Sequence, residues 1–146
     1  MAATDPLALE GQVCFALAAA SRSVIAAYRP VLEPLHLTHP QYLVMLALWE
    51  RTPLSLKEVS RLLRLDPGTL SPLAKRLEAL GYIERHRDAH DGRTLRITLT
   101  ERGRDLRAEA EKVPGQMMER LGLDTGDLVA LHATMTKLLT DTDQLG

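Results

Sequence analysis

A chain of 146 residues that is 45% hydrophobic and 25% charged has the length and composition of one globular domain. No apolar run is long enough to span a membrane, and a single cysteine excludes an intramolecular disulfide. Aromatic residues make up only 3% of the chain, which argues against the stacking platforms that bind single-stranded nucleic acid. The first residues, Met1 to Asp5, lack the basic start of a secretion signal, so we expect a cytoplasmic protein.

The net charge of −1 conceals an uneven distribution along the chain. Residues 57–104 contain eleven Lys or Arg and seven Asp or Glu, a net charge of +4, and the remainder carries −5. A basic middle between acidic ends is a modest indication of nucleic-acid binding.

The first predicted element is a long helix from about Pro6 to Val31. Asp5 is a suitable N-cap, and Pro6 fits the first helical position. Apolar residues recur at helical spacing, and several alanines would allow close packing against another helix. Pro30 and Pro34 are expected to end it.

Two shorter helices should follow. Thr38 is expected to cap the first of them, whose residues are apolar almost all round, so we expect that helix to be buried. Ser55 and Glu58 form the Ser-x-x-Glu capping box of the second.

Residues 65–81 predict a turn followed by an amphipathic helix. Asp66 can cap its start, Pro67 suits its first position, and Gly81 can close it in a left-handed conformation. The apolar residues that recur at spacings of three and four are Leu70, Leu73, Leu77 and Leu80.

The opposite face of this helix is small, polar and cationic, with Thr69, Ser71, Lys75 and Arg76. Pro72 predicts either a start nearer Thr69 or a bend at Ser71. A helix with an apolar back and a polar, cationic front fits the major groove of DNA, and with the preceding helix it makes a helix-turn-helix. Taken alone, the segment is equally compatible with an ordinary surface helix.

Alternating residues on both sides of Asp91-Gly92 predict a β-hairpin of residues 82–87 and 94–99. A solvated hairpin whose charges prevent edge-to-edge aggregation is one interpretation. Its position directly after a helix-turn-helix favours a DNA-binding wing. The wing would carry Arg85, Arg87, Arg93 and Arg96.

Helical patterns resume after Thr100, with a break at Pro114-Gly115 and a last helix beginning near Asp124. The predicted fold is therefore mainly α with a small β-hairpin wing, in one domain of residues 1–146. Residues 37–99 would form a winged helix-turn-helix, and residues 1–36 and 100–146 would supply dimerisation helices.

This order of helices, helix-turn-helix and wing resembles the MarR family of winged-helix repressors over the whole chain. Several segments look more specifically like its organic hydroperoxide resistance regulators. They are Glu10–Phe15 around the cysteine, Tyr28–Leu32 with Leu37–Tyr42, Leu65–Arg76, and Val113-Pro114-Gly115.

The resemblance implies a homodimer that binds operator DNA and represses transcription until an organic hydroperoxide oxidises Cys14. It assigns Arg93 to the minor groove and needs no cofactor. In these regulators two tyrosines of the partner subunit hold the reactive sulfur. Tyr28 matches the first tyrosine, but His39 stands at the position of the second.

Helix geometry adds a constraint of its own. Cys14 and Tyr28 are fourteen residues apart, or roughly 21 Å along one straight helix, so a contact between them requires an antiparallel second copy. If the predicted helix begins at Pro6, Cys14 lies too far from its N-terminus for the helix dipole to activate the thiol. A protonated His39 near the sulfur would lower the thiol pKa, whereas an exposed His39 would be inert.

Oxidation would convert Cys14 to a sulfenic acid. Because no second cysteine can resolve it, we expect either a mixed disulfide with a low-molecular-weight thiol or overoxidation. In a competing interpretation Cys14 is a small structural residue and a lipophilic or aromatic ligand induces the repressor. A thiol peroxidase and a helical module that does not bind DNA are further alternatives. The scattered histidines predict no metal site.

Overall fold

The structure of the protein is a computed structural model that describes residues 5–145. The first four residues, which bear on the predicted absence of a secretion signal, lie outside this range. Short 3₁₀ turns occupy Leu9–Gly11 and Glu33–Leu35. The helices and strands are α1 (Val13–Leu32), α2 (His39–Glu50), β1 (Leu54–Ser55), α3 (Leu56–Leu63), α4 (Pro67–Ala79), β2 (Ile83–Arg87), β3 (Leu95–Leu99), α5 (Glu101–Ala110), α6 (Val113–Leu121) and α7 (Thr125–Asp143).

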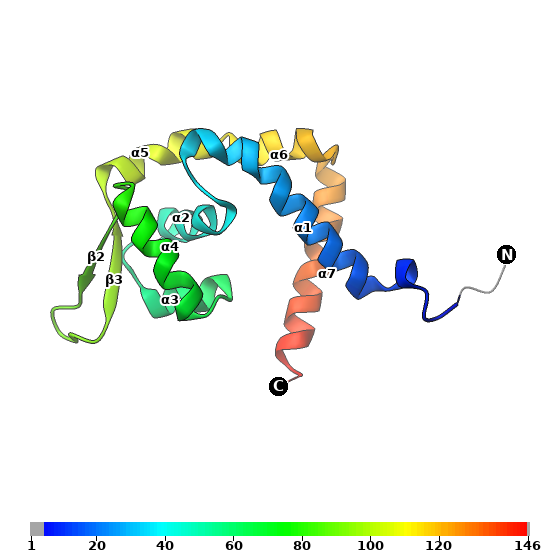
Figure 1. The fold of residues 1–146 in the computed structure, drawn as a ribbon, viewed down its shortest axis with the longest axis horizontal. Coiled ribbons are helices and arrows are strands. Elements are labelled where there is room, and N and C mark those ends of the chain that lie inside the picture. Colours follow the sequence, from blue (N-terminus) through cyan, green and yellow to red (C-terminus); the bar gives the residue numbers. More distant parts are fainter. Residues whose placement is uncertain (1–4, 146) are drawn as a thin grey trace.

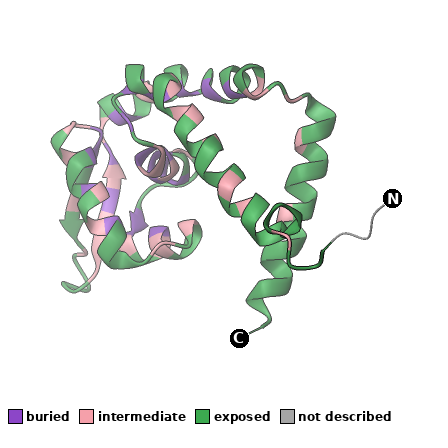
Figure 2. Ribbon diagram, turned by 45° about the vertical axis from the view of Figure 1, so that its right-hand side comes forward, coloured by how far each residue is buried: buried purple, intermediate pink, exposed green. Residues whose placement is uncertain are grey.

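These elements form a packed unit from which two long helices, α1 and α7, extend. Figure 1 shows α2, α3, α4 and the β2–β3 hairpin gathered together, with α5 and α6 leading away from them to α7. Buried residues concentrate in the packed unit, whereas the first half of α1 and all of α7 are exposed or only partly buried (Figure 2). Within residues 5–145, no helix is both long enough and apolar enough to cross a membrane.

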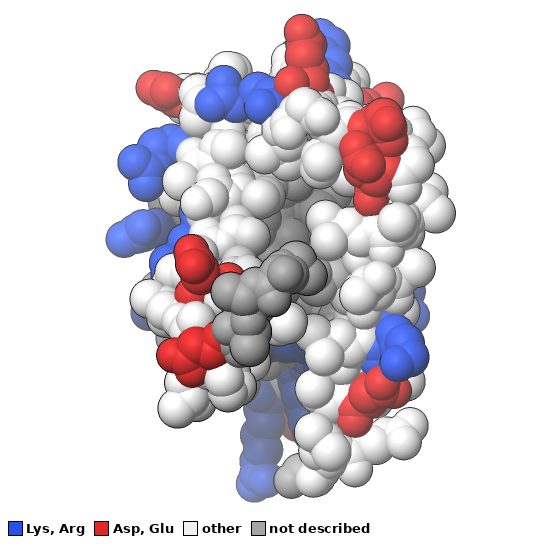
Figure 3. Space-filling model, turned by 90° about the vertical axis from the view of Figure 1, so that its right-hand side faces the viewer, with Lys and Arg blue, Asp and Glu red and all other residues white. Residues whose placement is uncertain are grey.

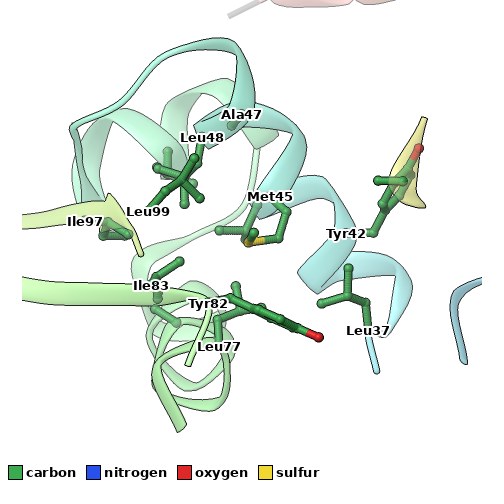
Figure 4. Packing of buried hydrophobic residues seen from close by; sticks show 14 of the residues in the cluster. Leu37, Tyr42, Met45, Ala47, Leu48, Leu77, Tyr82, Ile83, Ile97 and Leu99 are labelled. Carbon is green, nitrogen blue, oxygen red and sulfur yellow. The ribbon is translucent and has the colours of Figure 1, made fainter. Parts of the chain in front are cut away.

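The hydrophobic core forms where α2 meets α4 and the sheet. Met45 and Leu48 of α2 pack with Leu77 of α4 and with Ile83 and Ile97 of the sheet (Figure 4), and all five side chains are fully or almost fully buried. The predicted burial of the second helix is confirmed, because its apolar surface is covered on several sides.

The N-caps predicted for the helices after the first are confirmed, because they are local hydrogen bonds that the sequence specifies directly. Reciprocal capping boxes join Thr38 to Gln41 and Ser55 to Glu58. The side chain of Thr100 accepts from the amide of Gly103 at the start of α5. The expected break also occurs, since α5 ends at Ala110 and Pro114 lies in the first turn of α6.

The helix α4 begins at Pro67, so a start nearer Thr69 is wrong. Asp66 accepts a hydrogen bond from the Thr69 amide at 2.9 Å and so holds the first turn. Pro67 fits this turn because the missing N–H would have no acceptor within the helix there. Pro72 is accommodated inside the helix. Gly81 has φ +83° and reverses the chain as predicted.

The helix α1 begins at Val13, seven residues after the predicted start. Asp5 instead caps a turn by accepting from the Leu7 amide at 2.9 Å. The Gln12 side chain closes that turn by donating to the Pro6 carbonyl at 2.8 Å, and its own backbone is extended. Pro30 lies within the last turn of α1 and does not end it.

The predicted hairpin is confirmed, with Ile83 opposite Leu99 and Arg85 opposite Ile97. Its loop, residues 88–94, differs by one residue from the connection of residues 88–93 left between the two predicted strands. The strand β1 adds a third, outer strand by pairing with β3, so the strand order is β1-β3-β2. Sequence patterns did not reveal β1, because two residues are too few to show an alternation.

Candidate nucleic-acid interface and cysteine site

The helix α4 presents the predicted polar face to solvent. Leu70 and Leu77 are fully buried, and Thr69, Lys75 and Arg76 on the other faces are exposed. The hydroxyl of Thr69 donates to Asp66 at 2.9 Å, which fixes it beside the start of the helix. Because the buried face packs against the core and holds the helix in place, these exposed donors and cations can contact base edges and phosphates.

Two aspartates fix the backbone of the wing loop, residues 88–94. The Asp88 carboxylate accepts from the amide of His90 at 2.7 Å, and Asp91 accepts from the amide of Arg93 at 3.0 Å. The side chain of Arg93 is exposed at the loop tip, and Arg87 is exposed while donating to the Gly92 carbonyl at 3.0 Å. The loop therefore presents two guanidinium groups on a fixed backbone.

An ion pair closes the base of this loop. Arg96 of β3 pairs with Asp88, which also accepts the backbone amides of the loop. These hydrogen bonds, the one from Arg96 above all, lower the pKa of Asp88 to about 2. The carboxylate that holds the wing loop therefore stays ionised throughout the neutral pH range.

Arg85 lies differently from the other arginines of the predicted wing. Its guanidinium donates to Glu78 of α4 at 3.0 Å, its backbone amide donates to the same carboxylate at 3.1 Å, and its side chain is only 19% exposed. The hydrogen bond from Arg85 lowers the pKa of Glu78. This contact joins α4, the helix predicted to read the major groove, to the wing, and it shields Arg85 from solvent.

The two candidate DNA-contacting elements face the same way. Figure 1 shows the tip of the β2–β3 hairpin and the N-terminal end of α4 directed toward the same, lower side of the view. A helix entering a groove and a ribbon following the flanking backbone require this arrangement.

Cys14 is exposed and is the second residue of α1. The expectation that it lies two turns inside the helix is therefore wrong, because α1 begins at Val13. The side chain of the N-cap residue, Gln12, makes no capping hydrogen bond.

The structure brings Tyr28 and His39 together within one chain. Their ring centroids lie 4.8 Å apart, and Tyr42, three residues after His39 on α2, lies 5.9 Å from Tyr28. Burial lowers the pKa of His39, which keeps its imidazole neutral at neutral pH. Burial also raises the pKa of both tyrosines, and Tyr28 adds to the shift of Tyr42. This burial disfavours the protonated form of His39 in the single chain.

Sequence reasoning passed over Tyr42 as a member of this group. The signal was present, because residues three apart on a helix share a face, so His39 and Tyr42 both reach Tyr28. Cys14 of the same chain is separated from the group by most of α1, so only a second copy could bring a thiol to it.

A cleft of about 690 Å³ opens beside this group, between the second half of α1 and the start of α2. Its lining combines apolar side chains such as Ile25 and Leu37 with His39 and with three charged side chains, Arg22, Arg29 and Glu33. Its volume falls within the range of small-molecule sites.

The apolar residues of α1 and α7 remain exposed in the single chain. Val13 and Phe15 of α1, and Val129, Leu131 and Leu138 of α7, are each at least 42% exposed. Figure 3 shows the face formed by the extending helices as a broad uncharged surface with charged groups toward its edges. Apolar surface of this extent marks an interaction site.

Comparisons with known proteins identify the family and support the fold. Residues 26–110 match the model of a family described as transcriptional regulator SarA/Rot. The organic hydroperoxide resistance transcriptional regulator of Bacillus subtilis is 41% identical over 92% of both chains. The chain belongs to the MarR-type winged-helix transcriptional regulators. The resemblance seen in the sequence and the predicted winged-helix fold are confirmed.

Two further relatives of this regulator are informative. The regulator TtmR of Methylorubrum extorquens is 45% identical over 87% of this chain, which spans 65% of the length of TtmR. The structure of AbfR of Staphylococcus epidermidis is 34% identical, with a TM-score of 0.78 over 94% of this chain and 92% of AbfR. Structures of AbfR bound to DNA give TM-scores of 0.77 when reduced and 0.75 when overoxidised, and disulfide-formed AbfR gives 0.66.

Proposed function

We propose that this regulator binds operator DNA as a homodimer, represses transcription, and is released when an organic hydroperoxide oxidises Cys14. The observation that carries the proposal is the exposed cysteine in the first turn of α1, in a chain that holds a separate Tyr28–His39 pair on the same helix and its neighbour. The relationship to the hydroperoxide regulator of Bacillus subtilis supports the choice of oxidant.

DNA binding would use the exposed faces of α4 and the wing. Lys75 and Arg76 would bind phosphates or base edges in the major groove, with Thr69 and Ser71 as smaller donors. Arg93 would enter the adjacent minor groove. The wing would also use Arg87, and Arg85 would act by holding the wing against α4. DNA-bound AbfR structures of closely similar fold support this interface.

The homodimer would form through the exposed apolar faces of α1 and α7. Pairing two copies in antiparallel fashion would cover these faces and carry Cys14 of one copy to Tyr28 and His39 of the other. A neutral imidazole can accept the proton of the thiol, and the tyrosine hydroxyl can donate to the resulting thiolate. The redox site would therefore exist only in the dimer.

The proposed reaction consumes one hydroperoxide for each cysteine. The thiolate of Cys14 attacks the outer peroxide oxygen, so that an S–O bond forms as the O–O bond breaks. The remaining alkoxide leaves and takes up a proton to become an alcohol, and the sulfur is oxidised to the sulfenic acid. A low-molecular-weight thiol then forms a mixed disulfide with Cys14 and releases water.

The mixed disulfide is the end product that we favour over an overoxidised acid. AbfR has been solved overoxidised and still bound to DNA, with a TM-score close to that of its reduced complex, whereas its disulfide form is less similar to this chain. A bulky adduct between two subunits would change the distance between the two α4 helices and spoil the match to paired half-sites.

Titration of a protein–DNA complex with cumene hydroperoxide and a small thiol tests this function. The duplex is one that the reduced wild-type protein selects from a random-sequence pool. We expect the wild-type protein to dissociate and Cys14→Ser to bind equally well and to stay bound. Dissociation of both proteins alike would contradict the proposal.

The cleft beside His39 supports a second candidate function. A cleft of about 690 Å³ with apolar walls could hold a lipophilic or aromatic ligand that displaces DNA without using Cys14. In that case Cys14→Ser would respond to the ligand as the wild-type protein does, and hydroperoxide would have no effect on either.

A further inference from the structure

A bidentate ion pair connects the helix-turn-helix to the far end of the chain. Arg64 follows α3 and stands two residues before Asp66, the N-cap of α4. Its two terminal nitrogens donate to the two carboxylate oxygens of Asp143, each at 2.7 Å. Asp143 is the last residue of α7, so the pair joins the turn of the helix-turn-helix directly to a helix of the predicted dimer interface.

The geometry of this pair is also the geometry with which arginine binds phosphate. A guanidinium presents two parallel N–H donors, which match two oxygens of a carboxylate or of a phosphate equally well. Both side chains are 53% exposed, so another anion can reach the guanidinium from solvent. The Asp143 carboxylate therefore occupies an anion position that is open to competition.

The pair lies on the side of the molecule that would face DNA. In Figure 1 the C-terminal end of α7, the N-terminal end of α4 and the wing tip are all directed toward the lower side of the view. In a helix-turn-helix the reading helix enters the groove by its N-terminal end, and the helix before it crosses the sugar–phosphate backbone. Arg64 stands at the junction of these two helices, where a backbone phosphate would pass.

We propose that Arg64 is a DNA phosphate-binding residue, and that Asp143 holds its guanidinium in the free protein as a phosphate mimic. DNA binding exchanges the carboxylate for a phosphate and releases the end of α7. This inference rests on the proposed DNA binding and adds a contact to it. It also links the reading helix to the dimer interface, because the same exchange changes what holds α7.

Competition of this kind predicts opposite effects for the two partners. Removing the carboxylate frees Arg64 for phosphate, so Asp143→Asn should strengthen DNA binding. Removing the guanidinium with Arg64→Gln loses one phosphate contact and should weaken it. Once Arg64 is gone there is nothing left to release, so Arg64→Gln with Asp143→Asn should bind no more tightly than Arg64→Gln with Asp141→Asn, which removes the same charge.

Asp141→Asn is the matched control. Asp141 lies two residues before Asp143 on the same helix, and among residues 5–145 its one ion pair is with Lys137, at 3.5 Å. Both asparagine variants remove one negative charge from the end of α7, but only Asp143→Asn frees Arg64. Any difference between them therefore reports the ion pair and not the change in net charge.

The experiment measures binding of the full-length variants to a short mixed-sequence duplex at several salt concentrations, because non-specific binding depends on phosphate contacts. We expect Asp143→Asn to bind about two- to fivefold more tightly than Asp141→Asn, since an exposed pair offers only modest competition. For Arg64→Gln, the slope of log K against log salt should fall in magnitude by about 0.9.

Two results would overturn the inference while the wild-type protein binds DNA. One is Asp143→Asn binding no more tightly than Asp141→Asn, and the other is an unchanged salt slope for Arg64→Gln. Failure of the wild-type protein to bind any duplex would overturn the proposed DNA binding itself. The two failures are thus distinguishable in one set of titrations.

Discussion

At the scale of single residues, Gly103 lies where α5 packs closely against the backbone of Tyr82, just before β2. A Cβ built on Gly103 would lie 2.1 Å from the backbone carbonyl oxygen of Tyr82, which no side-chain movement can relieve. The carbonyl of Gly103 also accepts from the Trp49 indole at 2.9 Å. This glycine therefore fixes the approach of α5 to the end of α4.

We predict that Gly103→Ala lowers the free energy of unfolding by about 1–3 kcal/mol or more, because the backbone must shift to admit the methyl group. Gly115→Ala is the control, since nothing lies within 4 Å of that added Cβ and alanine suits a helix. Urea denaturation of both variants measures the effect. Equal stability of the two variants would show that α5 tolerates the displacement.

At the same scale, Arg93 is the residue on which the wing assignment depends. We predict that Arg93→Ala weakens binding to the selected duplex about 5- to 100-fold, in keeping with the loss of one or more base or phosphate contacts. Arg107→Ala removes the same charge from α5 and serves as the control. Titration followed by fluorescence anisotropy, with sedimentation to check the dimer, gives the result. Unchanged affinity would count against the wing.

At the scale of elements, the wing depends on a carboxylate whose titration sets its acid limit. The pKa of Asp88 is about 2 in the folded protein, against an ordinary value of 3.8, because Arg96 and backbone amides bind its ionised form. Its stabilising contribution is therefore fully present above about pH 4 and is lost as the pH falls from 3.8 through 2.

We predict that NMR signals of the loop, residues 88–94, titrate with a midpoint near pH 2 in the wild-type protein. In Asp88→Asn the loop amides should already show faster hydrogen exchange at neutral pH, because the neutral amide binds Arg96 more weakly. A wild-type midpoint near 4 would mean that the Asp88–Arg96 pair does not hold the wing in solution.

Elements also show what the sequence could and could not specify. The caps at Thr38, Ser55 and Thr100 were predictable because each is a hydrogen bond between residues three apart. The start of α1 was not predictable, because Asp5 and Pro6 carry a helix-start pattern that the structure uses for a separate turn.

The candidate sites divide along the same line. The polar face of α4 and the exposed Arg93 follow from helical spacing and from a local turn. The pairs Arg85–Glu78 and Arg64–Asp143 join residues on different elements, so no local pattern reports them. The same is true of Tyr28 and Tyr42, whose contact depends on how α1 crosses α2.

At the scale of the whole molecule, a single chain leaves α7 without one buried residue. A 19-residue helix with exposed leucines is stabilised by packing and not by propensity alone, so it needs a partner. We predict that the double substitution Leu131→Glu with Leu138→Glu yields monomers. Leu62→Glu, an equally exposed leucine on α3, is the control. Light scattering should show a dimer for the control, and a dimeric double variant would place the interface elsewhere.

We propose that release from DNA and oxidation of Cys14 are one event. The direct test treats the protein–DNA complex with less hydroperoxide than cysteine in the presence of a small thiol, separates bound from released protein, and determines the intact mass of each fraction. We predict unmodified Cys14 in the bound fraction and a mixed disulfide on Cys14 in the released fraction. Released protein with an unmodified Cys14 would contradict the account.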